Sequence, residues 1–211
     1  MVVVTGTSYP RRAGAQIDKQ IRTDILYGPR PMTFADLKRL LPVPRLDGSR
    51  NLIRQAWDVM SIVPGGKAVF SKLLGRAAPY SGSIHAQVLA LRSGYAEVQM
   101  QDRRGLRNHL DCVHAVALAN LAEMTGSLAL AYSLPDDARF IVSGMEIEYV
   151  KKARGTTTAV GEPPVPRIST RAAYDVPVTL RDATGEEVAR VVLHCLVGPK
   201  PGSPNERAHM N

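Results

Sequence analysis

The hydrophobic positions in the first part of the chain change from a helical to an alternating pattern. Apolar residues recur with helical spacing in NLIRQAWDVMSIV and in KAVFSKLLG, and Pro64-Gly65-Gly66 separates the two segments. We therefore predict two short helices, the second ending at Gly75. After Pro79, apolar and polar positions alternate in SIHAQVLALRSG and YAEVQMQD, and Ser93-Gly94 lies between them. This pattern predicts a β-hairpin.

A long apolar run follows, and beyond Pro135 the alternation returns in four segments that read as three or four strands. One long helix between two groups of antiparallel strands is typical of an α+β fold. We predict four parts: an N-terminal arm, partly ordered, at 1–50; a helical cover at 51–78; the main domain at 79–198; and a flexible tail at 199–211.

The apolar run carries one charged residue, Glu123. No Lys or Arg occurs between Arg107 and Arg139, and apolar residues surround the helix axis on nearly every side. Such a helix is expected to be wrapped by protein. Two interpretations of Glu123 stay open, because a buried carboxylate is destabilising unless it is paired. It is a structural group held by hydrogen bonds, or it is a catalytic base or nucleophile facing a pocket.

Other polar groups lie near Glu123 and at the helix start. Asn120 and Ser127 are spaced by three and four residues from Glu123, so the three share one stripe. Asp111 is the expected N-cap, which places His114 and the N–H groups of Ala115 and Val116 in the first turn. Unpaired N–H groups at a helix start can hold a developing oxyanion.

Composition limits the classes of partner. Of the 211 residues, 27 are Lys or Arg and 19 are Asp or Glu, a formal net charge of +8 that favours an anionic partner. Aromatic residues make up only 5%, and no nucleic-acid-binding motif is present, so we expect no nucleic acid. A central Glu argues against membrane insertion. Two cysteines and no signal-like start predict a cytoplasmic protein.

The segment around the helix resembles the signature of hotdog-fold thioesterases, in which a curved antiparallel sheet wraps a long helix. The matching residues are Asn108, then His114-Ala115-Val116, then Glu123 in ALAEMTGSLAL. The His-to-Glu spacing is similar to that of the phenylacetate-degradation and 4-hydroxybenzoyl-CoA branch. EYVKKARGTTTAVG and TLRDATGEEVARVVLHCLVG resemble later strands of the same superfamily. The resemblance covers about residues 70 to 198 and, with the cover helices, is nearest to a tetrameric acyl-CoA thioesterase branch.

This resemblance implies a function. Acyl-CoA would lie at a dimer interface, its thioester carbonyl on the N–H of Ala115 or Val116, and Glu123 of the partner subunit would attack it or activate water. Asn108 would orient water or the carbonyl, and His114 would fix the loop. The usual glycine pair after the histidine is Ala115-Val116 here. We expect a homodimer or a dimer of dimers, with no cofactor.

The remaining predictions concern ligands and rivals. Arg107, Lys152 and Arg154 are candidates for the CoA phosphates, although ordinary solvated turn charges are an equal alternative. The histidines lack metal-ligand spacing, so no metal site is predicted. The leading rival is a hotdog protein that binds acyl-CoA or another lipid-like ligand without turnover. A dehydratase of this fold is the third possibility, but HLDCVHAV lacks the prolines that such a site uses. Acyl chain length cannot be predicted from the sequence.

Overall fold

The computed structural model of the chain describes residues 50–203. The predicted arm, apart from its last residue, and most of the predicted tail lie outside this range. The described part holds a helical segment, a hairpin, one long helix and four further strands. Their bounds are α3 Leu52–Met60, α4 Gly66–Ala77, α5 Pro79–Gly82, β1 Gln87–Arg92, β2 Tyr95–Met100, η1 Arg104–Leu106, α6 Ala115–Ser133, β3 Ala138–Tyr149, β4 Thr157–Gly161, β5 Ala172–Arg181 and β6 Glu187–Pro199.

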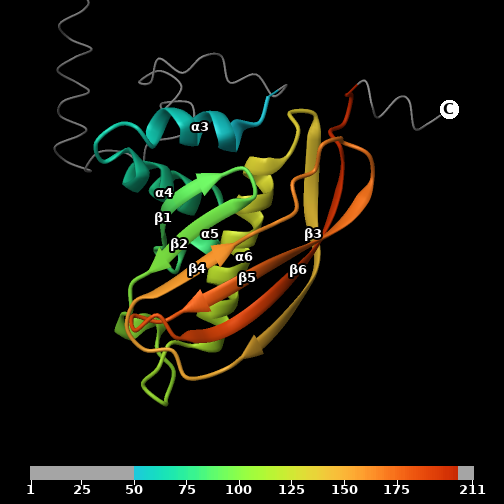
Figure 1. Cartoon of the computed structure of the whole chain (residues 1–211). Helices are drawn as coiled ribbons and strands as arrows, with labels where there is room; N and C mark the ends of the chain where they lie inside the picture. The colour runs from blue at the N-terminus through green and yellow to red at the C-terminus, as the bar shows by residue number, and fades with distance from the viewer. Residues whose placement is uncertain (1–49, 204–211) are drawn as a thin grey trace, which may run out of the picture. The chain divides into compact units, whose positions relative to one another are not determined.

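All six strands form one antiparallel sheet in the order β1-β2-β4-β5-β6-β3, and α6 lies along its concave face (Figure 1). The sequence-based prediction of an α+β fold with a long central helix is therefore confirmed. The predicted hairpin is also confirmed, with Gly94 at its turn in the left-handed region at φ 72°. The Gly94 N–H donates to the Ser133 hydroxyl at 2.9 Å, which ties the hairpin turn to the end of α6.

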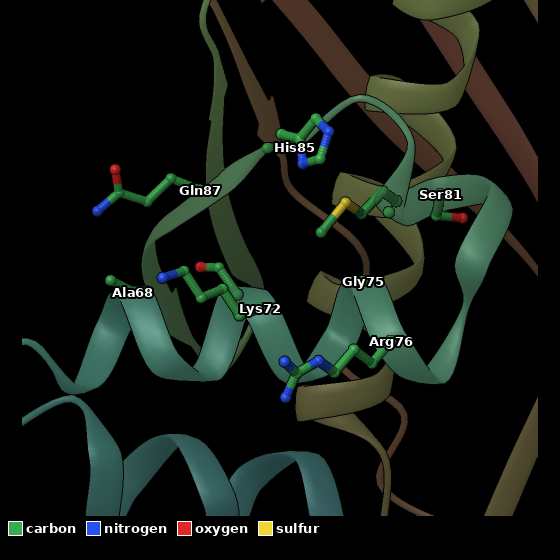
Figure 2. Close-up of a pocket in the computed structure, with 11 residues that line it drawn as sticks. Ala68, Lys72, Gly75, Arg76, Ser81, His85 and Gln87 are labelled. Carbon is green, nitrogen blue, oxygen red and sulfur yellow. The ribbon is translucent and has the colours of Figure 1, made fainter. Parts of the chain in front are cut away.

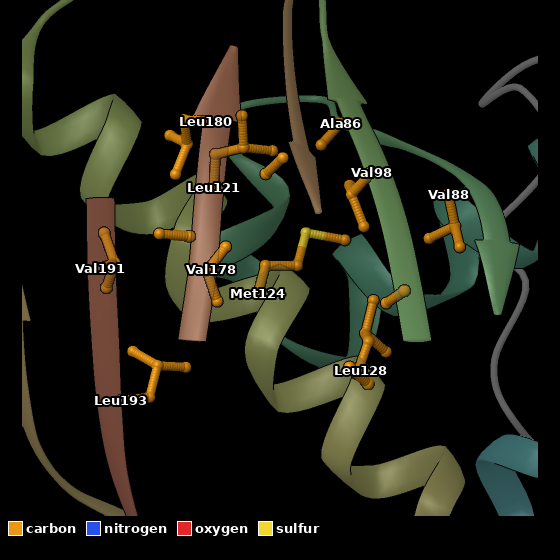
Figure 3. Packing of buried hydrophobic residues seen from close by; sticks show 14 of the residues in the cluster. Ala86, Val88, Val98, Leu121, Met124, Leu128, Val178, Leu180, Val191 and Leu193 are labelled. Atoms are coloured by element: carbon orange, nitrogen blue, oxygen red, sulfur yellow. The ribbon is translucent and has the colours of Figure 1, made fainter. Parts of the chain in front are cut away.

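The core lies between α6 and the sheet. Gly126 is the point of closest approach, because a Cβ there would meet Leu193 Cδ1 at 2.4 Å and Val178 Cγ2 at 3.0 Å. Buried apolar side chains from the helix and from the inner face of the strands fill the remaining space (Figure 3). They include Val88, Val98, Leu121, Met124, Leu128, Val178, Leu180, Val191 and Leu193.

The two cover helices extend this core, α3 against α6 and α4 against β1, and the residue before α3 also completes the end of α6. Asn51 Nδ2 donates to the carbonyls of Ala131 at 2.6 Å and Leu134 at 3.1 Å, which lie at the C-terminal end of α6, and the Arg54 guanidinium also donates to the Leu134 carbonyl. Trp57 of α3 packs edge-on against Phe70 of α4, with ring centroids 5.1 Å apart.

The second cover helix is longer than predicted. It continues past Gly75 to Ala77, so the prediction that it ends at Gly75 is wrong. The physical reason is packing, because an ideal Cβ on Gly75 would lie 3.1 Å from the Cα of Gly82. The glycine here permits a close approach of α4 and α5 rather than a helix stop.

One edge of the sheet is apolar and open. Strand β3 pairs with β6 on one side only within residues 50–203. Val142, Met145 and Tyr149 lie opposite β6 residues whose side chains are buried under α6, so all three face the helix side of the sheet. They are nevertheless 37%, 39% and 44% exposed. A long strand edge with exposed apolar side chains is a surface that other chains can pair with.

Helix α6 passes a length and composition test for crossing a membrane, and it alone does so among residues 50–203. Over its most apolar window, 56% of the residues are buried inside the protein. The sheet wraps it on one side and the cover helices pack on another. It is therefore the core helix that the sequence pattern predicts.

Candidate active site

The start of α6 is formed by a loop that crosses the end of the sheet. The Val113 N–H donates to the Ala153 carbonyl at 2.9 Å, and the His114 N–H donates to the Leu106 carbonyl at 2.7 Å. These bonds hold Val113 and His114 outside the helix, His114 in extended backbone, so His114, not Asp111, is the N-cap. The prediction of Asp111 as the N-cap is wrong. Asp111 instead lies in the loop at φ 50°, with its carboxylate on Arg107.

The two candidate oxyanion donors differ. Nδ1 of His114 accepts the Val116 N–H at 3.1 Å, which caps the helix and engages one of the donors. Within residues 50–203 no acceptor is found for the Ala115 N–H. Tyr149 of β3 donates its hydroxyl to the Ala115 carbonyl at 3.1 Å and so fixes that peptide on the side of β3. Ala115 is thus the N–H that is free to meet a ligand.

Four predicted residues line a small pocket at this helix start. His114, Val116, Asn120 and Arg107 face a cavity of about 180 Å³, together with residues of α5 and η1. Asn120 is buried, and its Nδ2 donates to the Tyr80 carbonyl at 3.2 Å. The structure therefore places Asn120 toward α5 rather than beside Glu123.

Asn108 holds the loop before the helix. Its Oδ1 accepts the Leu110 N–H at 2.9 Å and the Cys112 thiol at 3.3 Å. Within the described residues its Nδ2 has no partner, so one donor is left for a ligand or water. The side chain is part-buried, close to the start of α6.

Glu123 lies on a half-buried stripe of α6 with Ala119 and Ser127. The Ser127 hydroxyl donates to Glu123 Oε1 at 2.9 Å. No ion pair reaches the carboxylate from the described residues, so Oε2 is not neutralised by a Lys, Arg or His of residues 50–203. The carboxylate thus bonds to Ser127, whereas Asn120, the side-chain partner that the shared stripe suggested, bonds to the Tyr80 carbonyl instead. A carboxylate on a partly apolar stripe without a cation can accept a proton or attack a carbonyl.

The stripe faces the end of the sheet formed by β6 and β3. The pKa of the Cys195 thiol is raised to about 11, mostly by burial and in addition by the negative charges of Glu123 and Asp175. Cys195 lies on β6 directly opposite Val142 of β3. The Glu123 carboxylate therefore lies on the side of α6 that faces β6, where β6 pairs with β3.

One chain cannot bring these groups to one substrate carbonyl. Glu123 follows Ala115 by eight residues, which corresponds to roughly 12 Å along the helix axis. A reacting carbonyl must lie about 3 Å from both the oxyanion donor and the attacking group. Ala115 and Glu123 of one chain are therefore too far apart to act on the same carbonyl.

The three cations predicted to meet the CoA phosphates differ in their contacts within the protein. Arg107 donates to both carboxylate oxygens of Asp102, at 2.9 and 3.1 Å, and to Asp111 at 3.0 Å. Its guanidinium is thus committed within the protein, which argues against a role on CoA phosphates. Lys152 and Arg154 are exposed and flank Ala153, whose carbonyl holds Val113. They therefore lie beside the helix start.

Asp102 fastens this region. The Arg107 guanidinium, and in addition the Gly155 N–H at 3.0 Å, hold the pKa of Asp102 below its usual value, although burial opposes the shift. The carboxylate therefore joins the loop before α6 to the loop that carries Lys152 and Arg154.

Sequence reasoning missed the contribution of β3. Tyr149 and Met145 were part of an alternating segment, and nothing in the pattern indicated that the strand would be a free edge. Apolar residues occur on both faces of ARFIVSGMEIEYV, but this pattern does not distinguish an edge strand from a strand paired on both sides. No group of three or more His, Cys, Asp or Glu side chains that could hold a metal ion occurs in the part of the chain that the structure describes.

The chain matches one protein family and is similar to solved structures. A family model described as a domain of unknown function, DUF4442, matches residues 66–197, and the chain belongs to this family. The crystal structure of the structural genomics protein APC5556 is 32% identical, with a TM-score of 0.61, over 70% of this chain and 99% of that chain. Among curated proteins no match is found.

Other solved structures identify the fold. A protein of unknown function from Pseudomonas aeruginosa, PA5026, described as a probable thioesterase, is 22% identical, with a TM-score of 0.56, over 62% of this chain and 93% of that chain. The thioesterase HI1161 from Haemophilus influenzae is 15% identical, with a TM-score of 0.54, over 62% and 92%. The chain has the hotdog fold. The resemblance to the phenylacetate-degradation branch stays a prediction.

Proposed function

We propose that the protein is an acyl-CoA thioesterase. The observation that carries this proposal is the Glu123 carboxylate, which is half-buried, bonded to Ser127 and without a cation from the described residues, on the helix face toward β6, the strand next to the open β3 edge. Thioesterase descriptions of proteins with the same fold add support.

In the proposed reaction the acyl-CoA carbonyl oxygen accepts the Ala115 N–H, the free donor at the helix start. Glu123 then supplies the negative oxygen that the chemistry requires, either by taking a proton from water or by attacking the carbonyl carbon. The C–S bond breaks, the thiolate leaves as CoA and takes up a proton, and water provides the second oxygen of the carboxylic acid. Asn108 Nδ2 is the group proposed to orient water or the carbonyl.

The proposal includes a homodimer, or a dimer of dimers, formed by pairing of β3 edges. Ala115 and Glu123 on one helix are separated by roughly 12 Å. They therefore act on different substrates, or Ala115 of one copy acts together with Glu123 of the other. The exposed apolar residues of β3 offer the surface for that copy. Lys152 and Arg154 would then meet the CoA phosphates at the helix start.

A second candidate, binding of acyl-CoA or a lipid-like ligand without turnover, is favoured by one observation. Ala115-Val116 stand where thioesterases of this fold usually have a glycine pair, and Nδ1 of His114 accepts the Val116 N–H. If that capping bond persists with ligand bound, the carbonyl has one oxyanion donor instead of two, and loss of one such donor costs about 100-fold or more in kcat.

Purified protein and acyl-CoAs of graded chain length distinguish the two functions. The thioesterase proposal predicts release of free thiol with a preferred chain length, followed with a thiol-reactive chromophore. Saturable binding of acyl-CoA without thiol release at any chain length would leave the binding function and refute the catalytic one.

A further inference from the structure

We propose that a second pocket, separate from Glu123, binds a small phosphorylated molecule. The pocket has a volume of about 430 Å³, which lies in the range of small-molecule sites, and is formed by α4, α5 and the approach to β1. Lys72 and Arg76 come from α4, whereas His85 and Gln87 come from the opposite wall (Figure 2). No carboxylate lines it.

The cations of this pocket are unneutralised. Lys72 and Arg76 are one helical turn apart, and like charges at that spacing repel each other. Within residues 50–203 no hydrogen bond or ion pair engages either side chain, in contrast to Arg107 and Lys151, which are each held by two carboxylates. An anion between Lys72 and Arg76 would relieve the repulsion and supply the missing acceptors.

The opposite wall presents further donors. His85 has a φ of 51°, a backbone conformation that is uncommon for a residue other than glycine, and its side chain is exposed at the pocket. Strained residues of this kind concentrate at binding sites. Ser81 and Gln87 add a hydroxyl and an amide.

The other lining residues limit the class of ligand. Five of them are small or apolar, namely Ala68, Gly75, Gly82, Ala86 and Met124. A phosphate or diphosphate therefore fits at Lys72 and Arg76, and a small organic group fits against the apolar lining. Only Met124 belongs to α6, and Glu123 does not line the pocket, so this site is independent of the proposed thioesterase chemistry.

Calorimetry of the full chain with inorganic diphosphate tests the site. We expect saturable binding of one diphosphate per chain. The Lys72→Gln/Arg76→Gln variant should bind about tenfold more weakly or worse, because two charge-assisted contacts are lost. Arg104→Gln/Arg167→Gln removes the same charge from exposed positions elsewhere and should change affinity by less than about twofold.

A second measurement locates the bound diphosphate by NMR. In an NMR titration of the wild type, diphosphate should shift the Arg76 Nε–H and His85 ring signals first. Glu123→Gln should bind diphosphate as the wild type does, which separates this site from the thioesterase proposal. If added CoA displaces the diphosphate, the phosphates of CoA are the natural ligand; if diphosphate stays bound, a separate phosphorylated molecule is. Absence of saturable binding, or equal weakening in both double variants, would overturn the proposal.

Discussion

At the residue scale, the polar groups of the site were predictable in identity but only partly in geometry. Helical spacing placed Asn120, Glu123 and Ser127 on one stripe, but only Ser127 bonds to the carboxylate, whereas Asn120 bonds to the Tyr80 carbonyl. The N-cap was not predictable from local preference. Asp is normally a better N-cap than His. Here backbone bonds from Val113 and His114 to distant carbonyls hold both residues outside the helix.

The lowered pKa of Asp102 gives a prediction on acid stability. A carboxyl group whose pKa is lower in the folded than in the unfolded protein stabilises the fold. For Asp102 this contribution is fully present above the unfolded pKa of 3.8 and is lost as the pH falls through the folded pKa. Asp102→Asn should therefore lower the melting temperature by about 2–4 °C at neutral pH. Thermal melts across pH should show the gap from wild type closing below pH 3.8. A gap that stays constant to the lowest pH would contradict this assignment.

At the scale of elements, hydrophobic periodicity predicted the order of helices and strands. The alternation in YAEVQMQD and the continuous apolar run after it predicted β2 and α6, because burial on one face and burial all round give different patterns. Glycines were less informative. Gly75 read as a helix end, yet it lies within α4 where α5 approaches closely. A glycine that permits close packing and a glycine that ends a helix look alike in one sequence.

Gly126 is the position where this packing is tightest. An added methyl would lie 2.4 Å from Leu193 Cδ1, so the helix or the sheet would have to move. Gly126→Ala should destabilise the fold by about 1–3 kcal/mol, the usual effect of overpacking a core, despite the higher helix propensity of alanine. Denaturant unfolding measures this. The matched control is Ala119→Gly on the half-buried stripe, which should lose only about 1 kcal/mol of helix propensity. A Gly126→Ala variant as stable as wild type would refute the packing argument.

At the scale of the whole molecule, one chain carries the parts of a site but not their assembly. Neither the sequence nor the spacing of Ala115 and Glu123 indicated which surface would meet a second copy. Only the sheet order shows that β3 is an edge, because strand order depends on contacts between residues far apart in the chain. The proposed dimer follows from that edge and from the exposed apolar side chains along it.

A charge on the β3 edge should therefore separate the subunits. Met145→Lys would bury an unpaired ammonium in the proposed interface, which should weaken dimerisation by about 100-fold or more and abolish thiol release. Ile62→Lys changes an apolar side chain that is 81% exposed near the cover helices and should remain a dimer. Light scattering after size exclusion gives the masses. A monomeric wild type, or a Met145→Lys variant that stays dimeric and active, would contradict the proposed assembly.

The most direct test of the central claim compares thiol release from the preferred acyl-CoA by wild type and Glu123→Gln. The substitution keeps the shape of the side chain and an oxygen that can accept the Ser127 hydroxyl, so melting temperature and oligomeric state should not change. Loss of the negative oxygen should reduce kcat by at least about 100-fold. Equal turnover by a folded Glu123→Gln variant would show that this carboxylate does not carry the reaction.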